Sequence, residues 1–253
     1  MGNIIETITG KTMGESPLQN IDKIHTTPMG TERVIRNLNL KTDDVATWCK
    51  DAVTHADIII GHGKNWYVFR NGSVITINAD SFTVITAHKL NAKVRLMREW
   101  DYVCLPEFLY QAIYIPEGEE WPPRSIINDP NIIVYIKDFG TQLGDLGVVA
   151  KCEVSGQIIG AAWTRIIPAY GHIDHDTPEL AISLLPPFRN HGIGTKLMTK
   201  LFDVLRTNGY KQTSLSVQKD NPAVRFYQRL GYTVSGDRLD HAGHEDYLMM
   251  KEL

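Results

Sequence analysis

The most informative stretch of this sequence is Arg189-Asn190-His191-Gly192-Ile193-Gly194-Thr195, which separates an apolar segment at residues 180–185 from an amphipathic one. The first segment has the length of a buried strand, and the second carries apolar residues at helical spacing. The N–H groups of a helix's first turn lack partners within the helix and lie at the positive end of its dipole. The stretch therefore predicts an anion site, in which Arg189 adds charge and the glycines permit close backbone approach.

A second motif lies downstream, at residues 217–232, and contains Asn221-Pro222-Ala223-Val224-Arg225-Phe226-Tyr227. The first stretch resembles the (R/Q)xxGxG/A motif of the GNAT acetyltransferase family, and the second resembles that family's other hallmark. The similarity covers about residues 93–253 and is looser before residue 146. It implies an α/β fold in which helices flank a mixed sheet that is splayed at its centre.

The resemblance also implies acetyl-CoA as the cosubstrate and assigns residues to it. Residues 189–195 would hold the pyrophosphate, and the fourth strand of the family's sheet would offer main-chain contacts to pantetheine. The departure from the family pattern is Asn190-His191, where glycine and a basic residue are frequent, and backbone contacts should survive it. The implied cofactor-binding residues are Leu184, Leu185, Arg189, Asn190, His191, Gly192, Ile193, Gly194, Thr195 and Asn221.

The departing thiolate, with a thiol pKa of about 8.5, benefits from a proton donor close by. Tyr227 matches the family's tyrosine near the sulfur and is our candidate acid. The alternative interpretation is an aromatic residue on the buried face of a helix, beside Phe226.

Acetyl transfer also needs a neutral amine, whereas a lysine-like amine has a pKa of about 10.4 and is protonated at pH 7. The resemblance implies direct attack, so the protein must position the amine, deprotonate it and stabilise the oxyanion. We expect Glu179 to be the base, and the alternative is a solvated acid at a strand end. Other candidates for the base are His172, Asp174, His175 and Asp176. No metal is expected, because this loop lacks remote ligands.

Residues 18–92 are not needed for the GNAT fold and resemble an uncharacterised bacterial domain family. Helical spacing at residues 18–56 precedes three strand-like runs, two of which are joined by Asn71-Gly72, a hairpin signal. We therefore expect a small α+β domain here, after a loose lead-in arm at residues 1–17. Thr86 and His88, with His62 and Lys64, leave an RNase-like toxin module open, although a module for dimerisation or acceptor recognition is the simpler interpretation.

Composition bounds the remaining possibilities. The 253 residues are 43% hydrophobic and 22% charged, with no apolar run long enough to span a membrane. A net charge of -3 does not favour a nucleic-acid partner, and the three dispersed cysteines suggest neither a disulfide framework nor a metal site. The N-terminus lacks a secretory pattern, so we expect a cytoplasmic protein.

The sequence thus predicts an acetyl-CoA-dependent N-acetyltransferase domain at residues 93–253, acting on a primary amine in a small molecule or peptide. The competing hypothesis is a non-catalytic acyl-CoA-binding regulator. The acceptor pocket should be formed by residues 110–124, the loop near His172 and the segment after Gly231, and Glu117, Glu119 and Glu120 hint at a cationic acceptor. A homodimer is left open.

Overall fold

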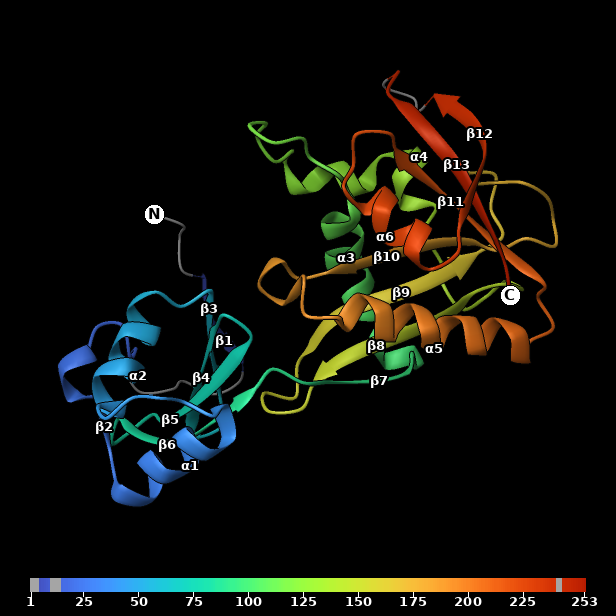
Figure 1. The fold of residues 1–253 in the computed structure, drawn as a ribbon. Coiled ribbons are helices and arrows are strands. Elements are labelled where there is room, and N and C mark those ends of the chain that lie inside the picture. The colour runs from blue at the N-terminus through green and yellow to red at the C-terminus, as the bar shows by residue number, and fades with distance from the viewer. Residues whose placement is uncertain (1–4, 10–14, 240–242) are drawn as a thin grey trace. The chain divides into compact units, whose positions relative to one another are not determined.

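The computed structural model describes residues 5–9, 15–239 and 243–253 (Figure 1). Its internal contacts divide the chain into two compact units. The first comprises Met1–Ala92 with Cys152–Gln157, and the second comprises Lys93–Lys151 with Ile158–Leu253.

The first unit is built on a six-stranded sheet in the order β1-β3-β4-β5-β6-β2, with α1 and α2 packed on one face. Asn71 and Gly72 join β4 to β5 with φ values of 46° and 71°, which is the left-handed conformation expected of this hairpin turn. Asp44 caps α2 by accepting from the Thr47 N–H. The elements are β1 (Ile5–Thr9), η1 (Ile21–Lys23), β2 (His25–Thr26), α1 (Pro28–Leu38), α2 (Val45–Thr54), β3 (Ile58–His62), β4 (Asn65–Arg70), β5 (Ser73–Asn78) and β6 (Thr83–Lys89).

The lead-in arm expected at residues 1–17 contains a strand. β1 pairs in parallel with β3, from Ile5 opposite Ile58 to Thr9 opposite His62. Residues 1–4 and 10–14 of that expectation lie outside the described part of the chain. Four of the five residues of β1 are β-branched, which is a local strand signal that the expectation of a loose arm did not use. Its pairing with β3 could not be predicted locally, because β3 lies far along the chain.

The second unit contains a seven-stranded sheet in the order β12-β13-β11-β10-β9-β8-β7. The helix expected near residues 124–127 is a 3-10 segment, η3. The elements are β7 (Ala92–Leu96), η2 (Glu99–Cys104), α3 (Leu105–Ala112), η3 (Arg124–Asn128), α4 (Pro130–Ile133), β8 (Leu146–Cys152), β9 (Ile158–Arg165), β10 (Glu179–Leu184), η4 (Pro186–Phe188), α5 (Ile193–Thr207), β11 (Gln212–Gln218), α6 (Ala223–Arg229), β12 (Thr233–Leu239) and β13 (Glu245–Glu252).

Helices α3 and α5 cover opposite faces of this sheet. Ala161 and Trp163 of β9 lie in one core cluster with Leu105 and Phe108, which belong to α3. The neighbouring residue Gly160 faces the opposite side of the sheet, because a Cβ placed on it would lie 3.2 Å from Leu197 of α5. This alternation is the two-residue period of a strand buried on both sides.

The sheet is splayed at its centre, as the resemblance implied. β10 pairs with β9 from Glu179 to Leu184, and β11 pairs with β13 from Gln212 to Gln218. Between β10 and β11 themselves, both described throughout, the parallel register contains one pair, Glu179 with Ser214. The two strands therefore diverge toward their carboxyl ends, and the gap between them is the natural place for a ligand.

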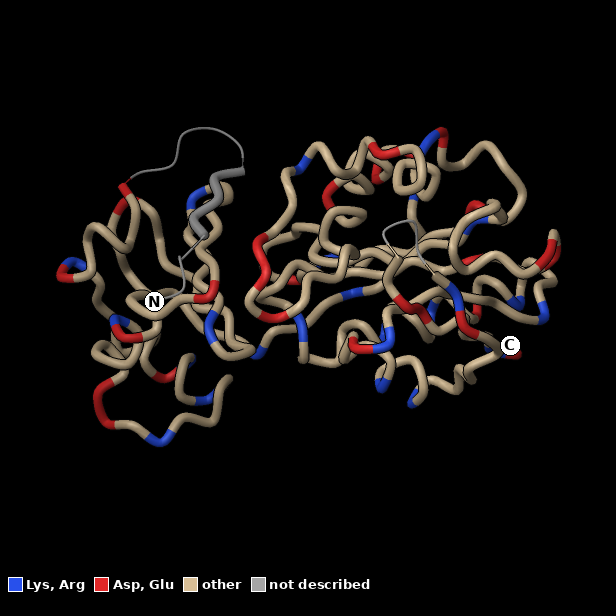
Figure 2. Tube along the Cα trace, turned by 90° about the horizontal axis from the view of Figure 1, so that it is seen from above, with Lys and Arg blue, Asp and Glu red and all other residues tan. Residues whose placement is uncertain are grey.

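In the described part of the chain, no helix has both the length and the apolar character needed to cross a membrane. Figure 2 shows Lys and Arg interspersed with Asp and Glu along the trace of both units. A positively charged site in this protein therefore depends on individual Lys or Arg side chains.

Candidate active site

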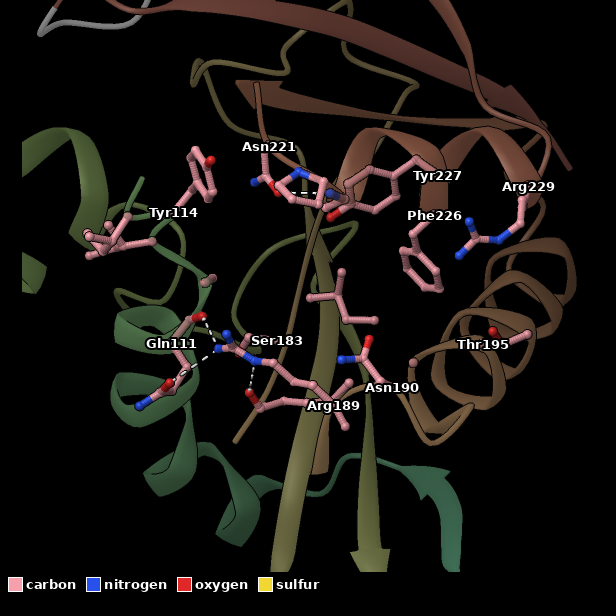
Figure 3. A pocket seen from close by; sticks show the side chains of 18 of the residues that line it. Gln111, Tyr114, Ser183, Arg189, Asn190, Thr195, Asn221, Phe226, Tyr227 and Arg229 are labelled. Atoms are coloured by element: carbon pink, nitrogen blue, oxygen red, sulfur yellow. Dashed lines mark hydrogen bonds between the residues drawn. The ribbon is translucent and has the colours of Figure 1, made fainter. Parts of the chain in front are cut away.

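A cavity of about 660 Å³ lies where β10 and β11 diverge (Figure 3). It is bounded by the end of α3 and the loop after it, by β10, by the turn into α5 and by α6. The lining residues are Gln111, Ala112, Ile113, Tyr114, Ile115, Trp121, Ile182, Ser183, Leu184, Arg189, Asn190, Gly192, Gly194, Thr195, Asn221, Pro222, Ala223, Phe226, Tyr227 and Arg229.

The first turn of α5 forms one wall of this cavity. Gly192 precedes the helix with a φ of 75°, and no side chain caps the helix at that residue. The backbone N–H groups of this turn therefore remain available to an anion, supported by the dipole of a 15-residue helix.

The two glycines of the turn have different roles. Gly192 provides the left-handed backbone, and a Cβ there would meet nothing within 4 Å. A Cβ on Gly194, by contrast, would lie 3.3 Å from Cζ of Phe226 and 3.5 Å from Cδ1 of Leu184. Gly194 therefore permits the close approach of α5 to β10 and α6.

Arg189 links two elements by hydrogen bonds and also supplies a positive charge. Its Nε donates to the carbonyl of Leu184 at 3.0 Å, and its Nη2 donates to the carbonyl and Oε1 of Gln111 at 3.2 and 3.3 Å. These bonds tie the end of β10 to α3 (Figure 3). Burial lowers the pKa of the guanidinium. Among the described residues no carboxylate lies within ion-pair distance, so this partly buried cation is not neutralised by the protein.

Tyr227 projects from α6 into the same cavity (Figure 3). The half-buried ring lies 5.4 Å from the Phe226 ring and 5.8 Å from the Tyr232 ring, and burial raises the pKa of its phenol to about 12. No residue in the described ranges hydrogen-bonds the hydroxyl. Tyr227 therefore stays protonated at neutral pH and can donate a hydrogen bond to a ligand.

Asn221 stands at the beginning of α6, also at the cavity. Its Oδ1 accepts from the N–H of Ala223 at 2.9 Å, which fixes the side chain. The amide nitrogen is left as the group that can contact a ligand.

Glu179 lies at the closed end of the splay and does not line the cavity. Its side chain is buried, with 3% exposure. Oε1 accepts from the hydroxyl of Tyr135 at 2.5 Å and from the N–H of Gly171 at 2.8 Å, whereas Oε2 has no partner among the described residues. Burial raises the pKa of the carboxyl to about 7, against the lowering effect of those two bonds.

The structure thus separates the predicted site residues into two groups. The residues brought together at the cavity are Leu184, Arg189, Asn190, Gly192, Gly194, Thr195, Asn221 and Tyr227. Those that do not line it are Leu185, whose N–H donates to Ile159, the exposed His191, the buried Ile193 and Glu179. Along a strand, main-chain groups alternate in direction, so Ile182 and Leu184, rather than Leu185, face the splay.

The alternative bases form a polar loop. Asp174 accepts from the N–H of Asp176 at 2.9 Å, and the rings of His172 and His175 lie 5.9 Å apart. The carbonyl of His172 accepts from Arg238 at 2.7 Å. Within the described ranges no group of three or more His, Cys, Asp or Glu is arranged to hold a metal ion.

The residues that suggested an RNase-like site in the first unit lie at opposite ends of β5. His88 is opposite Val74, near the β4–β5 turn. Lys64 lies at the other end, where its carbonyl accepts from the N–H of Ala79. Asn37 of α1 donates to Thr86 Oγ1 at 3.2 Å and lies 3.4 Å from Nδ1 of His88. His62 pairs with Asn65, which lies opposite Asn78, so His62 is at the same end of β5 as Lys64. The four residues therefore do not converge.

Sequence reasoning did not identify Ile182, Ser183, Phe226 or Arg229 as part of the site. Phe226 and Arg229 lie inside the second motif, and Ala223, Phe226 and Arg229 follow one another at intervals of three residues on the cavity side of α6. The available signal was therefore helical spacing from Ala223, because residues one or two positions from Tyr227 do not share its helix face. Gln111, Tyr114 and Trp121 lie in the region expected to form the acceptor pocket.

Comparisons with known proteins bear on both units. Residues 106–232 match the model of the "Acetyltransferase (GNAT) family", and residues 18–88 match a family described as "Protein of unknown function (DUF3781)". The chain is 32% identical over 98 residues to the uncharacterized protein YyaT of Bacillus subtilis, covering 38% of this chain and 60% of that protein. It is 30% identical over 88 residues to a mycothiol acetyltransferase of Arthrobacter sp., covering 34% and 27%. The matches thus span less than two thirds of these relatives.

Solved structures with a similar arrangement are also acetyltransferases. One is the ribosomal-protein-S18-alanine N-acetyltransferase of Escherichia coli, at 18% identity and a TM-score of 0.45, covering 64% of this chain and 94% of that one. Another is a phosphinothricin acetyltransferase of Sinorhizobium meliloti in complex with AcCoA, at 21% identity and a TM-score of 0.45, covering 64% and 88%.

Proposed function

Because this chain belongs to the acetyltransferase (GNAT) family, we propose that it transfers an acetyl group from acetyl-CoA to a primary amine by direct attack in a ternary complex. The observation that carries the proposal is the cavity, which joins the open first turn of α5, the unneutralised Arg189 and the hydroxyl of Tyr227 in one space. Such a cavity suits a ligand with phosphates at one end and a reacting thioester at the other.

The phosphate end of acetyl-CoA is assigned to the turn from Asn190 to Thr195. The pyrophosphate accepts hydrogen bonds from the backbone N–H groups there, and the positive charges of Arg189 and Arg229 lie on the same cavity. The pantetheine arm follows β10, where the main-chain groups of Ile182 and the N–H of Leu184 face the splay and are not used by β11. The carbonyl of Leu184 already accepts from Arg189.

The chemical step needs a base for the acceptor and an acid for the leaving group. Glu179, acting through water, takes the proton of the ammonium, and the neutral nitrogen then attacks the thioester carbonyl carbon. The C–S bond breaks as the carbonyl re-forms. The thiolate receives a proton from Tyr227, which regains one from the nitrogen, so the products are an amide and free CoA thiol.

A raised pKa fits Glu179 for this role. With a pKa of about 7 it is about half ionised at neutral pH, which suits a group that must both accept and release a proton. Its burial means that the amine's proton travels over an intervening water, since the carboxyl does not line the cavity.

The acceptor's charge is suggested by the cavity's rim. Desolvation raises the pKa of the Tyr114 phenol, which lines the cavity, and the charges of Asp220, Glu119 and Glu117 raise it further. These carboxylates come from two separate segments and favour an acceptor with positive charge beyond its reacting amine.

A screen tests the proposal and separates it from a non-catalytic regulator. Acetyl-CoA is incubated with amines, amino acids, aminoglycosides and basic peptides, and thiol release is followed. We expect release that depends on the acceptor and falls strongly in Glu179→Gln and Tyr227→Phe. Tight acetyl-CoA binding without turnover for any acceptor would favour the regulator. Unchanged rates in both variants would remove the assigned roles.

A further inference from the structure

The two carboxylate oxygens of Glu179 in β10 have different surroundings, because Tyr135 and Gly171, from two other segments, both bind the same oxygen. Oε1 receives two hydrogen bonds, one from the hydroxyl of Tyr135 at 2.5 Å and one from the N–H of Gly171 at 2.8 Å. Oε2 is buried and receives none from the described residues. A carboxylate held through one oxygen presents the other in a fixed direction, which is what a base requires.

Tyr135 is itself held in place by the sheet beneath it. The indole Nε1 of Trp163 donates to the carbonyl of Tyr135 at 3.0 Å. The buried Arg165 donates to the carbonyls of Val134 and Lys137 at 2.8 and 2.5 Å. The turn after α4 is thus fastened on both sides of Tyr135, and its hydroxyl has little freedom to leave Glu179.

The ionisable groups around this carboxyl can be named. Tyr135 comes from the turn after α4, and Tyr170 lies near it in the loop after β9. Arg238 of β12 lowers the Glu179 pKa through its charge. Arg165 stands opposite Glu179 in the β9–β10 register, but its guanidinium binds Asp145. Tyr135 is therefore the ionisable side chain that hydrogen-bonds the carboxylate directly.

We propose that Tyr135 is a positioning residue for acetyl transfer, which holds Oε1 of Glu179 so that Oε2 is the oxygen that accepts the proton. The inference rests on the proposed role of Glu179 as the base. Because the phenol donates to the ionised carboxylate, it also favours ionisation, and its removal raises the pH at which Glu179 ionises.

Carbon-13 NMR of the full chain labelled at the glutamate carboxyl carbon tests this without an acceptor. The Glu179 signal is identified as the one lost in Glu179→Gln. In Tyr135→Phe we expect its titration midpoint to rise by roughly one pH unit, and in the control Tyr102→Phe, a tyrosine of the same core, we expect no change. A midpoint that does not move in Tyr135→Phe overturns the proposal.

Kinetics with acetyl-CoA and the most active amine of the screen supply the second readout. A rise of one unit from a midpoint of about 7 lowers kcat/KM at pH 7 by roughly fivefold and leaves the plateau near pH 9 intact. A loss that is equal at every pH indicates a structural role alone and contradicts the proposal. If Tyr135→Phe unfolds, a ring-fluorinated tyrosine at position 135, a stronger donor, must instead move the midpoint down.

Failure of this inference is distinguishable from failure of the proposed function. In the profile of kcat/KM against pH, the ionisation of the base gives a fall toward acidic pH, which is called the acidic limb here. If Glu179→Gln retains both the wild-type rate and this limb, Glu179 is not the base. If Glu179→Gln abolishes the limb while Tyr135→Phe leaves it in place, the base assignment stands and the positioning role of Tyr135 falls.

Discussion

Arg165 and Glu179 lie directly opposite one another on β9 and β10, yet they do not form an ion pair. The guanidinium turns instead to Asp145, with Nε to Oδ1 at 2.7 Å and Nη2 to Oδ2 at 3.0 Å. Opposite residues of an antiparallel pair have Cβ atoms about 5 Å apart, so Glu179 is within reach of this cation. Asp145 therefore keeps Arg165 occupied and leaves Glu179 free to hold its raised pKa.

Replacing Asp145 with asparagine releases Arg165. We expect the free energy of unfolding to fall by about 3–5 kcal/mol, because a buried guanidinium loses its carboxylate partner. In the protein that remains folded, the freed cation should lower the Glu179 titration midpoint below its value of about 7. The control is Glu107→Gln, which breaks the more exposed pair with Arg124 and should cost less than about 1 kcal/mol. A midpoint unchanged or raised in Asp145→Asn would contradict the account.

Glu179 should make the protein less stable as the pH rises. Its folded-state pKa of about 7 exceeds the ordinary value of 4.5, so folding favours the protonated form. Stability is therefore lost as the pH rises from about 4.5 to about 7 and is constant above that. The shift of about 2.5 units corresponds to roughly 3 kcal/mol. Chemical denaturation should show Glu179→Gln to be more stable than wild type at pH 8 and nearly equal to it at pH 4.5. Equal stability at both pH values would argue against a raised pKa.

Gly194→Ala tests the close approach of α5 to the cavity. The new Cβ would lie 3.3 Å from Phe226, so that ring must shift by a few tenths of an ångström at the cavity wall. We therefore expect acetyl-CoA to bind roughly tenfold more weakly by calorimetry. Gly209→Ala, also in the second unit but outside the cavity and with nothing within 4 Å, is the matched control. Its left-handed φ should cost about 1 kcal/mol of stability and leave affinity unchanged. Equal affinities for the two variants would remove Gly194 from the site.

Arg229→Ala tests the positive charge that α6 contributes. Arg229 is exposed, lines the cavity and makes no ion pair within the described ranges, so its loss should leave the melting temperature unchanged. Acetyl-CoA binding should weaken severalfold, and the salt dependence of the dissociation constant should decrease, because one phosphate contact is lost. Arg225→Ala, on the same helix but outside the cavity, should change neither quantity.

The sequence was informative wherever a local pattern determines the structure. The Asn71-Gly72 hairpin, the long strands around Ser155-Gly156 and the helix after Gly192 carry their own turn and spacing signals, and all are observed. Several of the residues that the sequence assigned to acetyl-CoA lie together on the cavity, because residues 184–195 are close in the chain; their contact with a cofactor stays a prediction.

Contacts made between distant segments could not be foreseen. β1 depends on a partner at Ile58, and the burial of Glu179 depends on Tyr135 and Gly171, which no spacing rule connects to it. Arg189 was expected simply to add charge, whereas its hydrogen bonds to Leu184 and Gln111 also join β10 to α3. Side-chain partners of this kind are set by tertiary packing, which a local pattern does not contain.

Transfer of label tests the central claim most directly. Acetyl-CoA carrying a carbon-13 acetyl group is mixed with the full chain and the most active amine of the screen, and the products are analysed by mass spectrometry and thiol titration. The account predicts labelled amide and free CoA thiol in equal amounts, with strongly reduced yield for Tyr227→Phe. Thiol release without labelled amide, or no release with any amine despite saturable acetyl-CoA binding, would contradict it.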